Sequence, residues 1–290
     1  MIDWKSIQNK PLETLTDPEI IQKLCDELKI KPTRGAGQNF LIDSSILDDL
    51  LEAAEIKKSD CVLEIGSGFG ALTIALAQKA KQVVAVEKDP RIFEALEKIV
   101  ESYENVKLIN DDILRLQTIH YKLLTTRYKL VANLPYSITS AVLRKFTEEA
   151  PKPSVMVVMV QKEVAERICA MPGEMSLLSV AIQFYAKPEI VKIISREAFW
   201  PEPEVDSAII KLKVHKVIKF IKSGVDEKKF FQIVHIGFSS RRKQLQNNLA
   251  AGLRITNEKA REILVQVGFD QKIRAQELSV EDWIRLVKAL

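Results

Sequence analysis

The segment 64–70, EIGSGFG, combines glycines and an acidic residue in a spacing that could bind a nucleoside. Glycine lets the backbone turn tightly and approach a ligand, and the helical pattern that begins at residue 71 adds the partial positive charge of a helix N-terminus. Glu87 follows Gly68 by 19 positions, at the end of another apolar run. Its carboxylate could accept hydrogen bonds from both hydroxyl groups of a ribose. Taken alone, such glycines also fit an ordinary turn from strand to helix.

The same segment favours S-adenosylmethionine over a dinucleotide. A pyrophosphate is best bound by a G-x-G-x-x-G turn, whereas this turn is G-x-G-x-G with Glu64 in front of it. S-adenosylmethionine has no phosphate and carries a sulfonium cation, so a nearby carboxylate is tolerable or helpful. Asp111 and Asp112 end a third apolar run and could bind an adenine amino group, although a solvated acidic loop is the alternative.

The tetrapeptide Asn133-Leu134-Pro135-Tyr136 follows a fourth apolar run. The exocyclic amine of adenine is a poor nucleophile because its lone pair is delocalised into the ring. The Asn133 amide oxygen and the backbone carbonyl of Leu134 or Pro135 could accept its two N–H bonds and favour a pyramidal nitrogen. Pro135 fixes the backbone, and Tyr136 offers a face on which a flipped base can stack. Together with the glycine turn, this motif predicts methyl transfer to an adenine amine.

These groups would be positioned by a mostly parallel sheet. Between residues 61 and 214, short β-branched runs alternate with helical patterns, which predicts βαβ crossovers. A Pro-rich loop without helical pattern joins the last two runs, which predicts an antiparallel hairpin at the end of the sheet. The fold class is therefore α/β, with a Rossmann-like class I methyltransferase sheet. The predicted strands are 61–66, 82–88, 106–111, 129–135, 154–161, 189–196 and 207–214.

Helical periodicity replaces the strand pattern after about residue 215, which predicts a small all-helical C-terminal domain. Thr256 and Ser279 are the expected N-caps of two of its helices, and Asp17 that of a helix near the N-terminus. We expect an N-terminal extension (1–33), a methyltransferase domain (34–215) and a helical domain that contacts RNA (216–290).

The composition is that of a globular protein. The chain has 290 residues, of which 47% are hydrophobic and 28% charged, enough for more than one domain. It contains neither a signal-peptide pattern nor an apolar run that approaches about 18 residues, so we expect no membrane segment and a cytoplasmic location. The three cysteines and three histidines lack ligand spacing, so neither disulfides nor a metal site is expected.

Clustered cations are more informative here than the net charge of +4. The cationic triplet, residues 241–243, is expected to open a helix that also carries amide side chains, a combination that suits phosphate and sugar contacts. Cations are unfavourable at the positive end of a helix, which favours a functional reason over a solvated face. The predicted RNA-binding residues are Lys31 and Arg34, next to the segment GQNF, and Arg241, Arg242 and Lys243 of the triplet.

Eight motifs, in order over nearly the whole chain after residue 33, together resemble the KsgA/RsmA family of small-subunit rRNA adenine dimethyltransferases, relatives of the Erm enzymes. Two features depart from the family: Gln276 stands where glutamate is common, and the N-terminal extension is long. Neither touches the catalytic positions. The motifs are GQNFLID (37–43), VLEIGSGFGALT (62–73), VVAVEKDP (83–90), NDDIL (110–114), NLPYSITS (133–140), FWPEPEVDSAIIKL (199–212), GFSSRRKQLQNNL (237–249) and RAQELS (274–279).

The resemblance implies roles for particular residues. Phe199 would stack on the face of the target adenine opposite Tyr136, although without the resemblance it would be read as one hydrophobic residue of a loop. The implied cofactor-binding residues are Asn39 and Leu41 at the methionine end, Gly66 through its backbone, Glu87 at the ribose, Asp112 at the adenine, and Asn133 between cofactor and target base.

The resemblance also implies dimethylation of N6 in two adjacent adenosines near the 3′ end of 16S rRNA, within the small subunit or its precursor, without a metal. We expect a monomer. Two alternatives are an Erm-like enzyme that acts on 23S rRNA and a non-catalytic RNA-binding assembly or transcription factor on the same fold. The segments 241–249 and 274–279 argue against the first, and the intact Glu87, Asp112 and residues 133–136 against the second.

Overall fold

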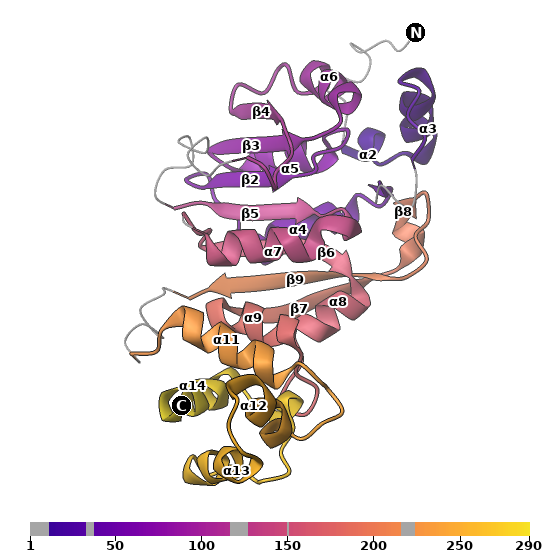
Figure 1. The fold of residues 1–290 in the computed structure, drawn as a ribbon. Helices are drawn as coiled ribbons and strands as arrows, with labels where there is room; N and C mark the ends of the chain where they lie inside the picture. The colour runs from indigo at the N-terminus through magenta and orange to yellow at the C-terminus, as the bar shows by residue number, and fades with distance from the viewer. Residues whose placement is uncertain (1–11, 33–37, 117–126, 150, 216–223) are drawn as a thin grey trace. The chain divides into compact units, whose positions relative to one another are not determined.

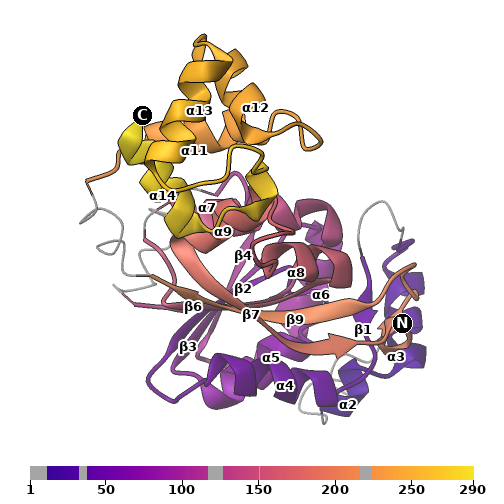
Figure 2. The ribbon, with the colours of Figure 1, turned by 90° about the horizontal axis from the view of Figure 1, so that it is seen from below.

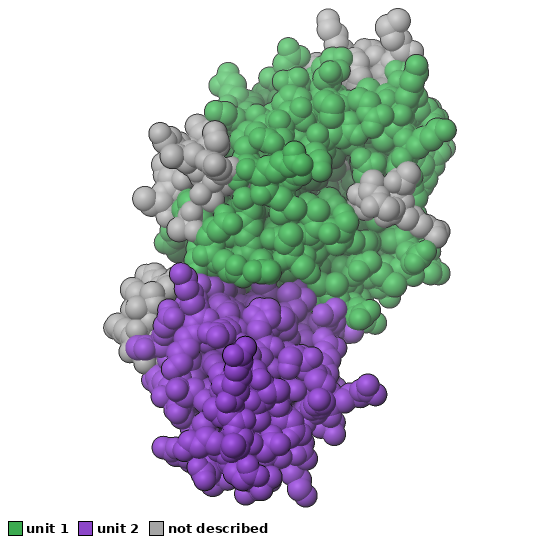
Figure 3. Space-filling view, viewed as in Figure 1, with its two compact units in different colours: residues 1–165, 189–214 green, residues 166–188, 215–290 purple. Residues whose placement is uncertain are grey.

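The computed structural model describes residues 12–32, 38–116, 127–149, 151–215 and 224–290 (Figure 1). The chain divides into two compact units (Figure 3). The first contains residues 1–165 and 189–214, and the second contains residues 166–188 and 215–290. None of the helices in the described ranges is both long and apolar enough to cross a membrane.

A seven-stranded sheet is the centre of the first unit. Its strand order is β4-β3-β2-β5-β6-β9-β7, with parallel pairing from β4 to β6 and antiparallel pairing between β6 and β9. The predicted mostly parallel sheet with a hairpin at its end is thus confirmed. The strands are β2 (Cys61–Ile65), β3 (Gln82–Glu87), β4 (Val106–Asn110), β5 (Lys129–Asn133), β6 (Val155–Gln161), β7 (Ala186–Ile194) and β9 (Ser207–Val214).

Helices cover both faces of this sheet (Figure 2). On one face, α4 (Ser45–Ala54) and α5 (Ala71–Lys79) pack their apolar residues against the sheet. On the other face lies α7 (Thr139–Glu148). Because both faces are covered, residues 156–160 of β6 have no exposed surface, which explains their uninterrupted apolar sequence.

The described N-terminal residues form two helices, α2 (Leu12–Leu15) and α3 (Pro18–Glu27). Asp17 caps α3, as predicted, by accepting a hydrogen bond from the Glu19 backbone N–H at 2.8 Å. The apolar side of α3 shares a hydrophobic cluster with α6 (Pro90–Ile99), so this segment belongs to the core of the first unit. A short pairing that the sequence does not reveal joins β1 (Phe40–Leu41) to β8 (Phe199–Trp200), antiparallel.

The second unit is helical and is built around the fully buried Trp283 and Phe230. Thr256 and Ser279 cap two of its helices, as predicted, through hydrogen bonds from the backbone N–H groups of Lys259 (3.2 Å) and Asp282 (3.1 Å). Its helices include α9 (Leu177–Tyr185), α11 (Glu227–Gly237), α12 (Leu245–Leu253), α13 (Asn257–Gln266) and α14 (Val280–Ala289), and α8 (Lys162–Ile168) ends in it.

Candidate active site

A cavity of about 620 Å³ lies in the first unit, where the loops after β2, β3, β4 and β5 meet. The carboxyl edge of a parallel sheet is where open α/β folds bind their ligands, because the loops after neighbouring strands converge there. The cavity brings together all six residues predicted to bind the cofactor: Asn39, Leu41, Gly66, Glu87, Asp112 and Asn133.

The glycines after β2 occupy backbone conformations and spaces that side chains would not fit. Gly66, Gly68 and Gly70 have φ angles of +72°, +55° and +89°. A Cβ on Gly66 would lie 3.4 Å from Cδ of Pro135, and one on Gly70 would lie 2.6 Å from a Leu96 methyl group. The turn can therefore lie close to the loop after β5 and to a ligand. The Gly66 N–H already donates to the Val86 carbonyl at 2.9 Å, so a backbone contact to a cofactor would use the Gly66 carbonyl.

Glu87 is held in place by the backbone around it. Oε1 accepts hydrogen bonds from the N–H groups of Lys88 (2.8 Å) and Asp89 (2.9 Å), and Oε2 from that of Gly68 (3.0 Å). Burial raises the pKa of this carboxyl group, and the three backbone donors oppose that shift. Because a carboxylate has about four acceptor positions, these donors leave room for about one ribose hydroxyl group, fewer than the two expected.

Asp112 is paired with Lys88, and both residues line the cavity. Its Oδ2 lies 2.9 Å from the Lys88 ammonium, and its Oδ1 accepts the Leu114 backbone N–H at 3.0 Å. The Lys88 hydrogen bond is the main reason why the pKa of Asp112 is lowered. The carboxylate is therefore ionised at neutral pH, and an adenine amino group would share it with Lys88 or displace that ammonium.

Glu64 is the most buried acid of the cavity lining, with 1% of its surface exposed. Its Oε2 accepts a hydrogen bond from the Thr73 hydroxyl at 2.6 Å. Burial raises the pKa of Glu64 to about 8. Burial therefore favours the protonated form of this carboxyl group, and a cationic ligand would favour its ionisation.

The loop after β5 leaves two acceptors of the predicted catalytic motif available. The Asn133 amide donates to the Asn39 carbonyl at 3.4 Å, which leaves its Oδ1 without a partner among the described residues. The Pro135 carbonyl accepts hydrogen bonds from the Ile138 N–H (3.1 Å) and the Thr139 hydroxyl (3.4 Å). The Leu134 carbonyl accepts none from the described chain, which leaves it free to accept the second N–H bond, although Leu134 is only 1% exposed and Pro135, not Leu134, lines the cavity.

The two aromatic residues expected to clamp the base differ in position. Tyr136 is partly exposed, in the 3₁₀ turn η3 (Tyr136–Ile138), and its hydroxyl lies 2.7 Å from that of Ser207. Neither aromatic residue is part of the cavity lining. Phe199 is only 2% exposed and packs in the core cluster beside Leu41. The structure therefore does not bring the Phe199 ring to the site. Ser207 was missed by sequence reasoning, although it is the serine in the motif FWPEPEVDSAIIKL.

The cationic triplet lies in a turn of the second unit. All three side chains are exposed, but α12 begins only at Leu245, so the prediction that they open a helix is wrong. The amide side chains that follow were expected to face RNA, yet Asn248 is buried and donates to the carbonyls of Gly237 (2.6 Å) and Ser240 (3.0 Å). These bonds stabilise the turn that carries the triplet. In the first unit Lys31 is exposed, and Arg34 lies outside the described residues.

The cavity fits S-adenosylmethionine better than a dinucleotide. Its volume is in the range of small-ligand sites, and its lining offers the carboxylates of Glu87 and Asp112 as acceptors. The cations of its described lining are Lys88 and Arg91. Lys88 is paired with the Asp112 carboxylate and Arg91 with the Asp89 carboxylate. No cation of this lining is therefore left for a pyrophosphate. Among the described residues, no group of three or more His, Cys, Asp or Glu side chains could hold a metal ion.

The sheet topology and this cavity define a class I methyltransferase. A profile of the family described as ribosomal RNA adenine dimethylase matches residues 31–290, and the chain belongs to that family. It is therefore an rRNA adenine dimethyltransferase that uses S-adenosylmethionine as its methyl donor.

Similar proteins cover nearly all of the chain. The Ribosomal RNA small subunit methyltransferase A of Dehalococcoides mccartyi strain CBDB1 is 43% identical over 279 residues, which cover 95% of both chains. The crystal structure of a dimethyladenosine transferase from Plasmodium falciparum matches with a TM-score of 0.72 at 27% identity, over 85% of this chain and 95% of that one. The 23S rRNA methyltransferase ErmE matches with a TM-score of 0.69 at 28% identity, over 87% and 99%.

Proposed function

We propose that this protein dimethylates N6 of two adjacent adenosines near the 3′ end of 16S rRNA during small-subunit biogenesis. The choice of the small subunit is supported by the relative named Ribosomal RNA small subunit methyltransferase A, which is 43% identical over 95% of both chains. The observation that carries the chemistry is Asn133 Oδ1, which has no partner among the described residues and lies at the cavity that contains Glu87 and Asp112. The carbonyl of the next residue, Leu134, would be the second acceptor. We further propose that the enzyme acts in the cytoplasm as a monomer.

The chain's own residues would activate the amine by position. S-adenosylmethionine supplies an electrophilic methyl group on a sulfonium cation. Asn133 Oδ1 and the Leu134 carbonyl accept the two N–H bonds of the adenine amine, which favours a pyramidal nitrogen with its lone pair directed at that methyl group. The amine nitrogen would gain the methyl group that the cofactor supplies, the C–S electron pair would remain with the departing thioether, and one of the two N–H protons oriented by these acceptors would be released to water. The ring of Tyr136 supports the flipped base.

Cofactor contacts would come from the other cavity residues. Glu87 would accept a ribose hydroxyl group and Asp112 the adenine amino group, while Asn39 and Leu41 would line the methionine end. The Gly66 carbonyl would provide the backbone contact. Phe199 would support Leu41 in the cavity wall, because the two residues are directly paired between β8 and β1.

An enzyme that acts on 23S rRNA is the alternative with the same chemistry. ErmE has a similar structure over 87% of this chain but is less identical in sequence, 28% against 43% for the small-subunit relative.

The contacts with RNA would come from Lys31 and Arg34 in the first unit and from Arg241, Arg242 and Lys243 in the second.

Mass spectrometry of rRNA would test the choice of target. The protein is incubated with labelled S-adenosylmethionine and under-methylated small subunits or, separately, large-subunit RNA. We expect dimethyladenosine in two adjacent nucleotides of 16S rRNA. Modification confined to the large-subunit RNA would overturn the proposal in favour of the ErmE-like activity.

A further inference from the structure

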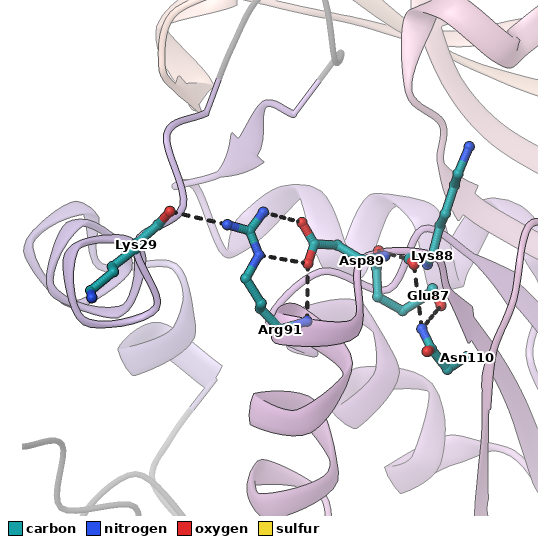
Figure 4. Close-up of polar contacts among 6 residues, drawn as sticks. All are labelled: Lys29, Glu87, Lys88, Asp89, Arg91 and Asn110. Atoms are coloured by element: carbon teal, nitrogen blue, oxygen red, sulfur yellow. Dashed lines mark hydrogen bonds and ion pairs between the residues drawn. The ribbon is translucent and has the colours of Figure 1, made fainter.

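The end of α3 is joined to Glu87 through the side chain of Arg91 (Figure 4). Arg91 Nη1 donates to the Lys29 backbone carbonyl at 3.0 Å. Its Nε and Nη2 donate to the two carboxylate oxygens of Asp89, at 3.1 and 2.7 Å. The Asp89 backbone N–H donates in turn to Glu87 Oε1 at 2.9 Å, and the Gly68 N–H binds Oε2 of the same carboxylate. Two sets of hydrogen bonds, joined through Asp89 itself, thus connect the residue that follows α3 with the glycine turn.

The same N-terminal helices form part of the cavity wall. Leu15 of α2 is buried. It lines the cavity together with Asp89 and Arg91. Ile21 and Leu24 of α3 share a hydrophobic cluster with residues of α6 and with Phe69, which lies in the glycine turn. The N-terminal helices therefore contact the cofactor cavity both through apolar packing and through the hydrogen bonds of Arg91.

We propose that Arg91 is a positioning residue for cofactor binding: it docks the N-terminal helices as a wall of the cavity and fixes the loop that orients Glu87. This inference rests on the proposed role of Glu87 at the ribose. The guanidinium suits this task because its planar fork binds the Asp89 carboxylate with two donors and still has a third donor for the Lys29 carbonyl. Docking of the helices and binding of the cofactor must then strengthen each other to the same extent.

Replacement of Arg91 tests the inference. We expect Arg91→Ala to raise the dissociation constant for S-adenosylmethionine about tenfold, because a charge-assisted, bidentate contact is lost. Turnover at saturating cofactor and RNA should stay close to that of the wild type, since Arg91 would not touch the reacting atoms. Arg144→Ala is the matched control, because Arg144 pairs with Glu148 on the exposed side of α7 and should leave the affinity unchanged. Unchanged affinity in Arg91→Ala, or lost turnover with normal affinity, would overturn the inference.

Hydrogen exchange on the wild-type protein tests the reciprocal effect. S-adenosylmethionine should slow exchange of the backbone amides of residues 18–30, and Arg91→Ala should reduce that protection. No protection in the wild type contradicts the inference without reliance on any variant. If Arg91→Ala does not fold, Arg91→Gln replaces it in the titration, because its amide can still donate to the Lys29 carbonyl but cannot form the bidentate contact.

Glu87→Ala separates failure of the positioning role of Arg91 from failure of the proposed role of Glu87. If this variant binds the cofactor weakly and Arg91→Ala binds it normally, only the positioning role of Arg91 fails. If both variants bind it normally, the proposed placement of the cofactor at Glu87 fails as well.

Discussion

The hydroxyl groups of Tyr136 and Ser207 lie 2.7 Å apart and join the loop after β5 to the first residue of β9. Ser207 is fully buried and is paired with Gln161 at the end of the antiparallel β6–β9 ladder. The position of the Tyr136 ring is therefore fixed by the part of the sheet that departs from parallel pairing. Since the ring is proposed to support the target base, Ser207 would orient the base through Tyr136.

We expect Ser207→Ala to lower the rate of single-turnover methylation and to leave the affinity for S-adenosylmethionine unchanged. The substitution removes the partner of the Tyr136 hydroxyl, at a cost of roughly 1–2 kcal/mol in folding free energy. Tyr136→Phe removes the same hydrogen bond from the other side, so the double variant should be little slower than either single variant. Rates that fall independently in the two variants would show that the hydrogen bond does not orient the ring.

The cationic triplet gives a prediction on RNA binding. Replacement of Arg241, Arg242 and Lys243 by alanine should weaken binding of small-subunit RNA and reduce its dependence on salt, because each lost phosphate contact removes about 0.7–0.9 from the slope of log K against log salt concentration. Filter binding at several salt concentrations measures both quantities. Cofactor affinity serves as the internal control and should not change. An unaltered slope would identify the triplet as a solvated surface.

The strands were predictable because a strand that is buried on both faces has a short, continuous apolar sequence. Runs such as 155–160 are apolar throughout, and the structure covers both of their faces, so composition and burial agree. The glycine turn and Glu87 were predictable for a similar reason, since each follows directly after a strand and the carboxyl ends of parallel strands share one edge.

Contacts between distant segments were not predictable. Arg91 and Lys29 are 62 positions apart, and Tyr136 and Ser207 are 71 apart. No local periodicity records which donor meets which carbonyl, so both contacts were found only in the folded chain.

The orientation of some polar and aromatic side chains was not predictable either, because the local sequence pattern does not specify it. Asn248 was expected at a surface, but its amide binds two backbone carbonyls within the second unit. Phe199 was expected at the base, but its ring fills a hydrophobic cluster.

Phe199→Ala should therefore act mainly on stability, because truncation of a buried phenylalanine costs about 3–5 kcal/mol.

Glu64 should make the stability of the cofactor-free protein depend on pH. Burial raises its pKa from 4.5 to about 8. Below pH 4.5 the carboxyl group is protonated in both the folded and the unfolded state. Between pH 4.5 and about 8 the unfolded chain loses this proton and the folded chain keeps it, so the free energy of unfolding falls as pH rises. Above about pH 8 both states are ionised and the decrease ends.

Glu64→Gln should remove this part of the pH dependence, because an amide of similar shape does not ionise. Urea unfolding at pH 6 and pH 8 should show a decrease of about 2 kcal/mol in the wild type that is missing in the variant. The comparison of the two proteins cancels other titrating groups. Parallel pH profiles would mean that Glu64 is ionised in the folded protein and that burial does not control its charge.

Asn133 gives the sharpest test of the chemistry. Its Oδ1 is proposed to accept one N–H bond of the adenine amine, and this hydrogen bond strengthens as the nitrogen becomes pyramidal. Asn133→Ala should therefore lower the single-turnover rate on saturating RNA and cofactor by about 100-fold or more, with a much smaller effect on RNA binding. Asn133→Asp should retain more activity than Asn133→Ala, because the carboxylate still offers an acceptor, although it loses the bond to the Asn39 carbonyl.

Binding measurements separate this effect from damage to the cavity, which Asn133 also lines. Cofactor affinity is measured by calorimetry for both variants, and the rates are compared only at saturation. If Asn133→Ala keeps a near-normal single-turnover rate, the segment from Asn133 to Tyr136 is no more than a turn at the end of β5. The amine would then have to be oriented by other acceptors, and the assignment of Asn133 and the Leu134 carbonyl would have to be abandoned.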